Sequence, residues 1–182
     1  MIWKTRSSHY LFTDNWLTLR ADTCEREDGT IIAPYYVYEF PDWVTAVPVT
    51  RDGKIVLVQQ YRHALGEICI EIPGGCMDAA DASAEAACAR ELLEETGYQF
   101  THFTPLCVTS ANPSTHTNRM HVFLATGGEQ VQTQQLDGGE EINVLLYTLT
   151  EVKQLLREQK IIQSMHVTAL FYALQQMGEI NL

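Results

Sequence analysis

The stretch Arg90–Tyr98 reads RELLEETGY, and it lies in a segment with clear helix boundaries. The hydroxyl of Ser83 can cap the start of a helix by accepting a hydrogen bond from a main-chain N–H. Alanines and leucines, which favour helix, fill the segment that follows. Gly97 suits the end because glycine readily adopts a left-handed conformation. The sequence therefore predicts a helix over Ser83–Thr96.

Three glutamates of this helix share one face. Residues three and four apart are neighbours on a helix, so Glu91 lies beside Glu94 and Glu95. Carboxylates this close repel and raise one another's pKa unless a cation compensates, and a hard divalent cation takes oxygen ligands. Arg90, four residues before Glu94, can orient that carboxylate as part of the catalytic group. The pattern predicts a metal site; the alternative is an ordinary solvated helix face.

A glycine loop precedes the helix. Residues Ile68–Ile72 alternate apolar and acidic side chains and predict a short strand that ends at Pro73. Gly74 follows, and its carbonyl can approach the same metal ions because glycine lets the main chain come close. Two such ions on a diphosphate would neutralise charge, activate a water and stabilise the leaving oxygen.

Together these residues resemble the Nudix box, which reads glycine, five residues, glutamate, seven residues and then R-E-U-x-E-E-x-G-U with U apolar. The second half matches at every specified position through Gly97, with Tyr98 in the last apolar place. In the first half, five residues after Gly75 lead to Asp81 instead of glutamate, and eight residues separate Asp81 from Arg90. We infer a one-residue insertion, which leaves open the role of this outer acid, an auxiliary group in the family.

Further segments look like the branch of ADP-ribose pyrophosphatases and nucleoside-diphosphate-sugar hydrolases, and this likeness covers most of the chain beyond about residue 35. They are Trp43, Gln59–His63, Glu71–Gly74 and Gly138–Ile142. The resemblance implies Mg²⁺-dependent hydrolysis, with Mn²⁺ as a substitute, that yields a nucleoside monophosphate and a sugar phosphate. ADP-ribose is the first candidate substrate. GDP-mannose is the second, because the loop Ser110–Arg119 lacks the serine-proline-glycine pattern of related enzymes.

The resemblance also points to an acidic loop, where that branch has a catalytic base or a metal-bound carboxylate. A water nucleophile needs an acceptor for its proton, and a carboxylate far from the helix can supply it. We assign this role to Glu140 first and to Glu141 second. The alternative is that both glutamates only solvate the loop.

Five residues are candidates for contacting the substrate. Arg62 can reach a phosphate, and Glu71 a ribose hydroxyl or Arg62 itself. Trp43 and Tyr36 offer flat faces to a nucleobase, and Arg119 can contact phosphate or sugar. The alternatives are a surface salt bridge for Arg62 and core packing for the aromatic residues.

The remaining pattern predicts an α+β fold, namely an α/β/α sandwich with a mixed sheet, plus a small antiparallel hairpin at the N-terminus. The resemblance to related enzymes implies that residues 1–40 are a β extension that exchanges across a homodimer whose partner helps to frame the base, and that residues 41–182 are the Nudix domain. The other predicted strands and helices are Val44–Val49, Ile55–Tyr61, Met120–Ala125, Ile142–Leu149, a helix capped by Thr150 and a helix over Ser164–Met177, with a polar loop over Gly127–Glu141.

Composition narrows the alternatives. The 182 residues, 46% of them hydrophobic, suit one domain with a core, and a net charge of −11 opposes nucleic-acid binding. Five widely spaced cysteines suit reduced thiols, and we find no secretion signal or membrane-length apolar run, so we expect a cytoplasmic protein without a membrane partner. Two alternatives remain: a Nudix enzyme for dinucleoside polyphosphates or oxidised nucleoside triphosphates, and a non-catalytic ligand sensor, which the intact glutamates oppose.

Overall fold

The computed structural model describes residues 2–181, which divide into two compact units. The first unit contains the chain up to Asp42 together with the segment Ser110–Arg119. The second contains Trp43–Thr109 and the chain from Met120 onwards. The residues with predicted metal-binding and catalytic roles all belong to the second unit.

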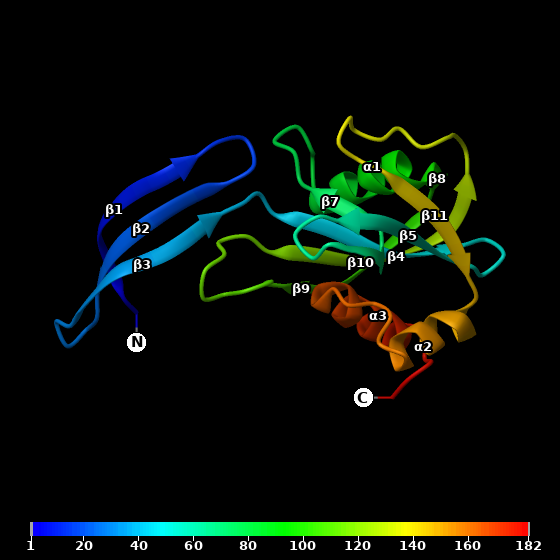
Figure 1. The fold of residues 1–182 in the computed structure, drawn as a ribbon. Helices are drawn as coiled ribbons and strands as arrows, with labels where there is room; N and C mark the ends of the chain where they lie inside the picture. Colours follow the sequence, from blue (N-terminus) through cyan, green and yellow to red (C-terminus); the bar gives the residue numbers. More distant parts are fainter. Residues whose placement is uncertain (1, 182) are drawn as a thin grey trace. The chain divides into compact units, whose positions relative to one another are not determined.

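The first unit is built on an antiparallel sheet with the strand order β1-β2-β3 (Figure 1). Its strands are β1 (Lys4–Thr13), β2 (Thr18–Glu25) and β3 (Ile31–Glu39). The sequence predicted a two-stranded hairpin here, whereas the sheet has three strands. Aromatic and β-branched residues are frequent from Tyr35 to Val49, but Pro41, two residues after β3, has no N–H to donate to a strand neighbour. The segment therefore divides into β3 and a second strand, Trp43–Thr50, which belongs to the other unit.

The second unit contains a mixed sheet with the path β11-β5-β4-β10-β8. In addition, β6 pairs with β5, β7 with β4, and β9 with β10; the pair β10–β4 is parallel and the others are antiparallel. The strands are β4 (Trp43–Thr50), β5 (Ile55–Arg62), β6 (Glu67–Glu71), β7 (Gly74–Cys76), β8 (Tyr98–Gln99), β9 (His102–Thr109), β10 (Met120–Gln130) and β11 (Ile142–Tyr147).

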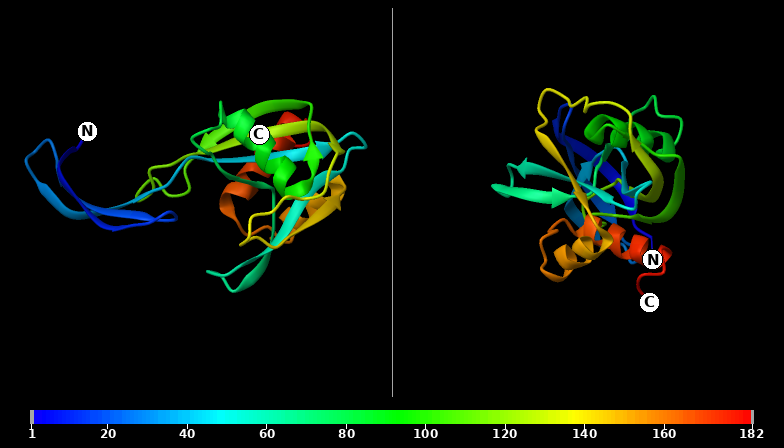
Figure 2. Two further views of the ribbon diagram at one scale, coloured as in Figure 1. Left: turned by 90° about the horizontal axis from the view of Figure 1, so that it is seen from above. Right: turned by 90° about the vertical axis from the view of Figure 1, so that its right-hand side faces the viewer.

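Helices cover both faces of this sheet. Figures 1 and 2 show α1 (Ala84–Thr96) on one face and α2 (Leu149–Arg157) with α3 (Ser164–Gln176) on the other. The predicted α/β/α sandwich with a mixed sheet is confirmed. None of the helices between residues 2 and 181 combines the length and the apolar character needed to cross a membrane.

Two hydrophobic cores result from the alternation of side chains along the strands. Ala46 packs in the core on the α1 side with Leu92, and its neighbour Val47 packs in the other core with Leu57 and Leu170. All five side chains are almost fully buried. Burial of each leucine stabilises the folded state by on the order of 2 kcal/mol. Packing of this kind holds α1 on the sheet.

Several predicted boundaries are wrong. Strand β10 continues to Gln130, so the loop predicted from Gly127 begins later. Helix α2 is capped by Thr148 instead of Thr150. Thr148 and Glu151 form a reciprocal capping box, whereas no acidic residue lies three positions after Thr150. Strand β11 consequently ends at Tyr147, two residues earlier than predicted.

Candidate active site

The helix α1 that carries the glutamates has the predicted ends. The Ser83 hydroxyl accepts a hydrogen bond from the Ala86 N–H at 3.1 Å, and the Gly97 N–H donates to the Leu93 carbonyl. Gly97 adopts φ 75°, and an added Cβ there would lie 2.2 Å from the Gln132 carbonyl oxygen. Glycine at this position therefore ends the helix and also lets a distant loop approach it.

Arg90 holds the acidic groups of this region together. Its Nη1 donates to Glu91 Oε1 at 3.0 Å and to Glu94 Oε2 at 2.9 Å. On its other edge, Nε and Nη2 donate to the two carboxylate oxygens of Asp81 at 3.2 and 3.0 Å, and Nη2 also reaches the Cys76 carbonyl. The hydrogen bonds with Arg90 lower the pKa of Asp81. Arg90 thus contacts Glu94 in the geometry anticipated for orienting it, and Asp81 orients Arg90.

Glu95 is held separately, by the glycine loop. Its side chain is buried, and its Oε2 accepts a hydrogen bond from the Gly74 N–H at 2.9 Å. A Cβ on Gly74 would lie 2.2 Å from the Val44 carbonyl oxygen, so only glycine fits between β4 and Glu95. The sequence drew attention to the carbonyl of Gly74, and its role as a metal ligand stays a prediction.

The cluster carries more negative charge than Arg90 balances. Burial raises the pKa of Glu91 to about 7; Arg90 opposes this shift, and the charges of Glu94 and Glu140 add to it. Burial also raises the pKa of Glu95 to about 8, and the charges of Glu91 and Glu140 add to that shift. The charge of Glu140, the predicted loop acid, thus adds to the pKa shifts of both buried glutamates of the helix.

This donor set fits a hard divalent cation. Carboxylate oxygens are the ligands that Mg²⁺ and Mn²⁺ prefer, and the raised pKa values show that the site favours added positive charge. Between residues 2 and 181, no three Asp, Glu, His or Cys side chains already stand in a ligand arrangement. In the structure the carboxylates have other partners: Arg90 binds Glu91 and Glu94, and Glu95 accepts from Gly74. Side-chain rotation would free these oxygens for a cation.

Glu140 lies in a tight turn. Its N–H donates to the Asp137 carbonyl at 2.9 Å, and its own Oε2 accepts from the Asp137 N–H at 3.1 Å. Glu141, the second candidate, is exposed beside it. Whether either glutamate accepts the proton of water remains a prediction.

Arg62 and Glu71 form an ion pair at the ends of β5 and β6. Arg62 Nε donates to Glu71 Oε1 at 2.9 Å, and Gln60 Nε2 donates to Glu71 Oε2 at 3.4 Å. The Glu71 side chain is 3% exposed and that of Arg62 is 46% exposed. Of the two partners considered for Glu71, the arginine is therefore the one in contact, and the outer part of Arg62 remains accessible to an anion.

The other predicted substrate residues are Trp43, Tyr36 and Arg119. Trp43 starts β4 opposite Cys76 and packs partly against the core on the α3 side. Tyr36 and Arg119 belong to the first unit, where Tyr36 is about half exposed and the Arg119 N–H donates to Asp42 Oδ1 at 2.8 Å. Their contact with substrate stays a prediction.

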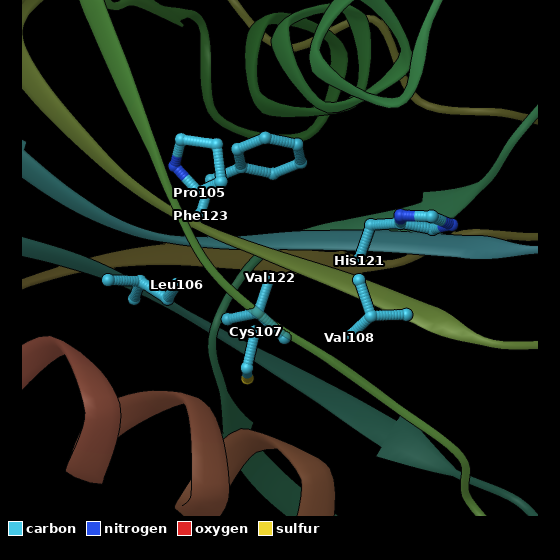
Figure 3. Close-up of a pocket in the computed structure, with 7 residues that line it drawn as sticks. All are labelled: Pro105, Leu106, Cys107, Val108, His121, Val122 and Phe123. Atoms are coloured by element: carbon cyan, nitrogen blue, oxygen red, sulfur yellow. The ribbon is translucent and has the colours of Figure 1, made fainter.

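A shallow apolar hollow lies elsewhere, on β9 and β10. Figure 3 shows its lining, with Phe123 and Cys107 on opposite sides of the strands. Its lining residues are Pro105, Leu106, Cys107, Val108, His121, Val122 and Phe123. This lining contains no carboxylate, lysine or arginine, so it lacks the permanently charged side chains that a diphosphate and its metal ions would need.

The helix, its glycine loop and the Arg90 cluster lie within residues 40–167, which match the family model of the NUDIX domain. The chain belongs to the Nudix family. Residues 3–38, which include most of the three-stranded sheet, match the model described as the nucleoside diphosphate sugar hydrolase N-terminal domain. The two models together match most of the chain of this Nudix protein, up to residue 167.

Similar proteins align over most of their length. The methanol dehydrogenase activator of Bacillus methanolicus is 28% identical, with 93% of this chain and 91% of the relative covered. The ADP-ribose pyrophosphatase of Bacillus subtilis is 27% identical, with the same two coverages. The GDP-mannose pyrophosphatase of Klebsiella pneumoniae is 28% identical, with 92% and 89% covered. A crystal structure of an ADP compounds hydrolase has a TM-score of 0.85 at 21% identity, covering 99% of this chain and 98% of that one, which supports the Nudix fold.

Proposed function

We propose that this Nudix protein hydrolyses the pyrophosphate of a nucleoside diphosphate sugar, with ADP-ribose as the first candidate and GDP-mannose as the second. The products are a nucleoside monophosphate and a sugar phosphate. The observation that carries the proposal is the set of three glutamates on one face of α1, of which Glu91 and Glu94 bind Arg90 and Glu95 binds the glycine loop. The match of residues 3–38 to the sugar-hydrolase N-terminal model and the two pyrophosphatase relatives support the substrate class.

Three carboxylates and a main-chain carbonyl would hold the metal: Glu91, Glu94, Glu95 and Gly74. Magnesium, with manganese as a substitute, would supply charge neutralisation of the diphosphate and acidification of water. Arg90 keeps two of the carboxylates oriented from one side, and Asp81 keeps Arg90 in place.

The protein's own groups would carry the proton. Water attacks one phosphorus, a new P–O bond forms, and the bond to the bridging oxygen breaks. Glu140, or Glu141 as second candidate, accepts the proton of the attacking water. Arg62 projects its exposed edge toward solvent while Glu71 fixes its inner edge, which suits it for contacting a phosphate.

We further propose that the protein is a homodimer. All residues of β1 are exposed, and large apolar side chains lie on it, namely Tyr10, Leu11 and Phe12, each about half exposed. Exposed apolar side chains can contribute to interaction surfaces, and a second copy is the partner we propose. Sedimentation velocity of the wild type and of Leu11→Glu tests this; a monomeric wild type would contradict it.

The five free cysteines support a reducing, cytoplasmic location.

The first experiment is a substrate panel. Phosphate released after coupling to a phosphatase is measured with ADP-ribose, GDP-mannose, other nucleotide sugars, dinucleoside polyphosphates and nucleoside triphosphates, with Mg²⁺, for wild type and Glu94→Gln. We expect fast turnover of one nucleotide sugar that the substitution abolishes. Preferential turnover of a triphosphate or a dinucleoside polyphosphate would overturn the substrate class, and turnover of nothing would overturn the hydrolase reading in favour of a binding protein.

A further inference from the structure

The loop after β10 is bonded to the C-terminal end of α1. The N–H groups of Val131 and Gln132 donate to the Gly97 carbonyl at 3.0 and 3.3 Å, and the Gln135 N–H donates to the Glu94 carbonyl at 2.8 Å. The last carbonyls of a helix have no partner within the helix, so this loop satisfies them. Figure 1 shows the loop passing the end of α1 before it enters β11. The helix with the metal-site glutamates and the loop with Glu140 are therefore mechanically connected.

One side chain makes this connection to both elements at once. Gln134 Nε2 donates to the Glu95 carbonyl at 2.6 Å and to the Ile142 carbonyl at 3.0 Å. Glu95 lies in the last turn of α1, and Ile142 is the first residue of β11. The amide group thus uses both N–H bonds and clamps the two ends of the segment Gln135–Glu141.

The segment between these anchors has little else to hold it. A Cβ added to Gly138 or to Gly139 would meet nothing within 4 Å. Glu140 and Asp137 bond only within their own turn in the contacts described above, and both are exposed. The position of the Glu140 carboxylate relative to α1 consequently depends on where the segment is anchored.

We propose that Gln134 is a positioning residue, which holds the acidic segment against α1 so that Glu140 or Glu141 can reach the attacking water. This inference rests on the proposed function. It concerns the proton acceptor and leaves the cation ligands untouched, because Gln134 contacts the carbonyl of Glu95 and not its carboxylate. Misplacing a catalytic group by about 1 Å can reduce turnover by about 100-fold.

The test uses Gln134→Glu with Gln135→Ala as the matched control. Gln134→Glu keeps the shape but replaces the donating nitrogen by an oxygen that faces two carbonyls. Gln135 bonds to α1 through its main chain, so Gln135→Ala keeps that bond. We expect Gln134→Glu to lower kcat by about 10- to 100-fold with KM and Mn²⁺ affinity within about threefold, and to speed amide hydrogen exchange in residues 136–141. The control Gln135→Ala should stay near wild type in kcat, KM, Mn²⁺ affinity and amide hydrogen exchange.

A double-mutant cycle separates positioning from general structural damage. Gln134→Glu is combined with Glu140→Gln and Glu141→Gln in one chain. If Gln134 acts through these carboxylates, its substitution causes no further loss of kcat in their absence. A full additional loss in the combined variant, or unchanged kcat in Gln134→Glu while wild type is active, would overturn the inference and leave the proposed function standing. If the wild type turns over no nucleotide sugar, the proposed function fails. Unchanged amide hydrogen exchange in residues 136–141 of Gln134→Glu would overturn the anchoring by Gln134.

Discussion

Helix α1 and the segment Gln135–Glu141 both carry carboxylates of the same site, yet they hold them in different ways. On α1, Glu91 and Glu95 are mostly buried and hydrogen-bonded to Arg90 and Gly74. In the acidic segment, Glu140 is exposed and bonded within its own turn. The first set is fixed by a core-packed helix and the second by a few anchoring bonds.

This difference suggests a division of labour. Buried acids on a core-packed helix, with raised pKa values, are suited to holding a cation. An exposed acid on a lightly held segment can move, and loops that complete a site upon substrate binding are drawn from such segments. We therefore expect substitutions in the two regions to affect different kinetic parameters.

After the loss of turnover expected for Glu94→Gln, the largest effect is expected in the acidic segment. Glu140→Gln should lower kcat by about 10²- to 10⁴-fold because it removes the proposed proton acceptor, while Mn²⁺ affinity, measured by electron paramagnetic resonance, falls less than tenfold. Glu141→Gln is the matched control and should retain more activity. A larger loss in Glu141→Gln would move the assignment to that residue.

The next effect is expected in the glycine loop that faces α1. A Cβ at Gly75 would lie 2.6 Å from the Glu91 carboxylate, so Gly75→Ala must displace this flexible side chain. We expect activity to fall by up to about 100-fold with Tm nearly unchanged, and Mn²⁺ affinity to fall in parallel. Gly138→Ala, which meets no neighbour within 4 Å, is the comparison. Equal activity in both variants would contradict the fixed placement of Glu91.

A smaller effect should follow from Asp81→Asn. This change weakens the double hydrogen bond with Arg90, which keeps its bonds to Glu91 and Glu94. Loss of an orienting partner typically costs about 10-fold or more in metal affinity or activity, and we expect the lower end. Steady-state kinetics over a range of Mg²⁺ concentrations measures it. Wild-type activity in this variant would show that Arg90 needs no support from Asp81.

The smallest expected effect is a loss of folding stability with rising pH, measured in the presence of a chelator. The pKa values of about 7 for Glu91 and about 8 for Glu95 exceed the ordinary 4.5, so the folded chain binds more protons. Their contribution to stability is fully present below about pH 4.5 and is lost as the pH rises through 7 and 8. Between about pH 6.5 and pH 8 we expect a loss on the order of 2 kcal/mol, or a Tm lower by about 5 °C.

Glu95→Gln provides the control for this pH dependence, because it cannot ionise and should flatten the decline. The pH range avoids His166, whose pKa burial lowers to about 4 from 6.5. That histidine destabilises the fold only as the pH falls below about 6.5. A Tm of the wild type that is constant or rising over the chosen range would contradict the burial of uncompensated charge at Glu91 and Glu95.

The sequence predicted local features whose physics is local. Ser83 and Gly97 bound the helix because a hydroxyl cap and a left-handed glycine act within one turn. The contact of Arg90 with Glu94 follows from helix periodicity alone. The N-terminal sheet was underestimated by one strand because the break at Pro41 is a weaker signal than the run of β-branched residues around it.

Other features required the folded chain. The spacing of Asp81 left its role open, and only the path of the loop shows both of its oxygens on Arg90. No pattern in the sequence marks Gln134, because its amide contacts Glu95 and Ile142 through their carbonyls, which every residue has. The sequence by itself determined the Nudix family and the residues that carry charge. The tertiary structure decided which groups hold those charges in place, since contacts between distant main-chain atoms leave no trace in residue type.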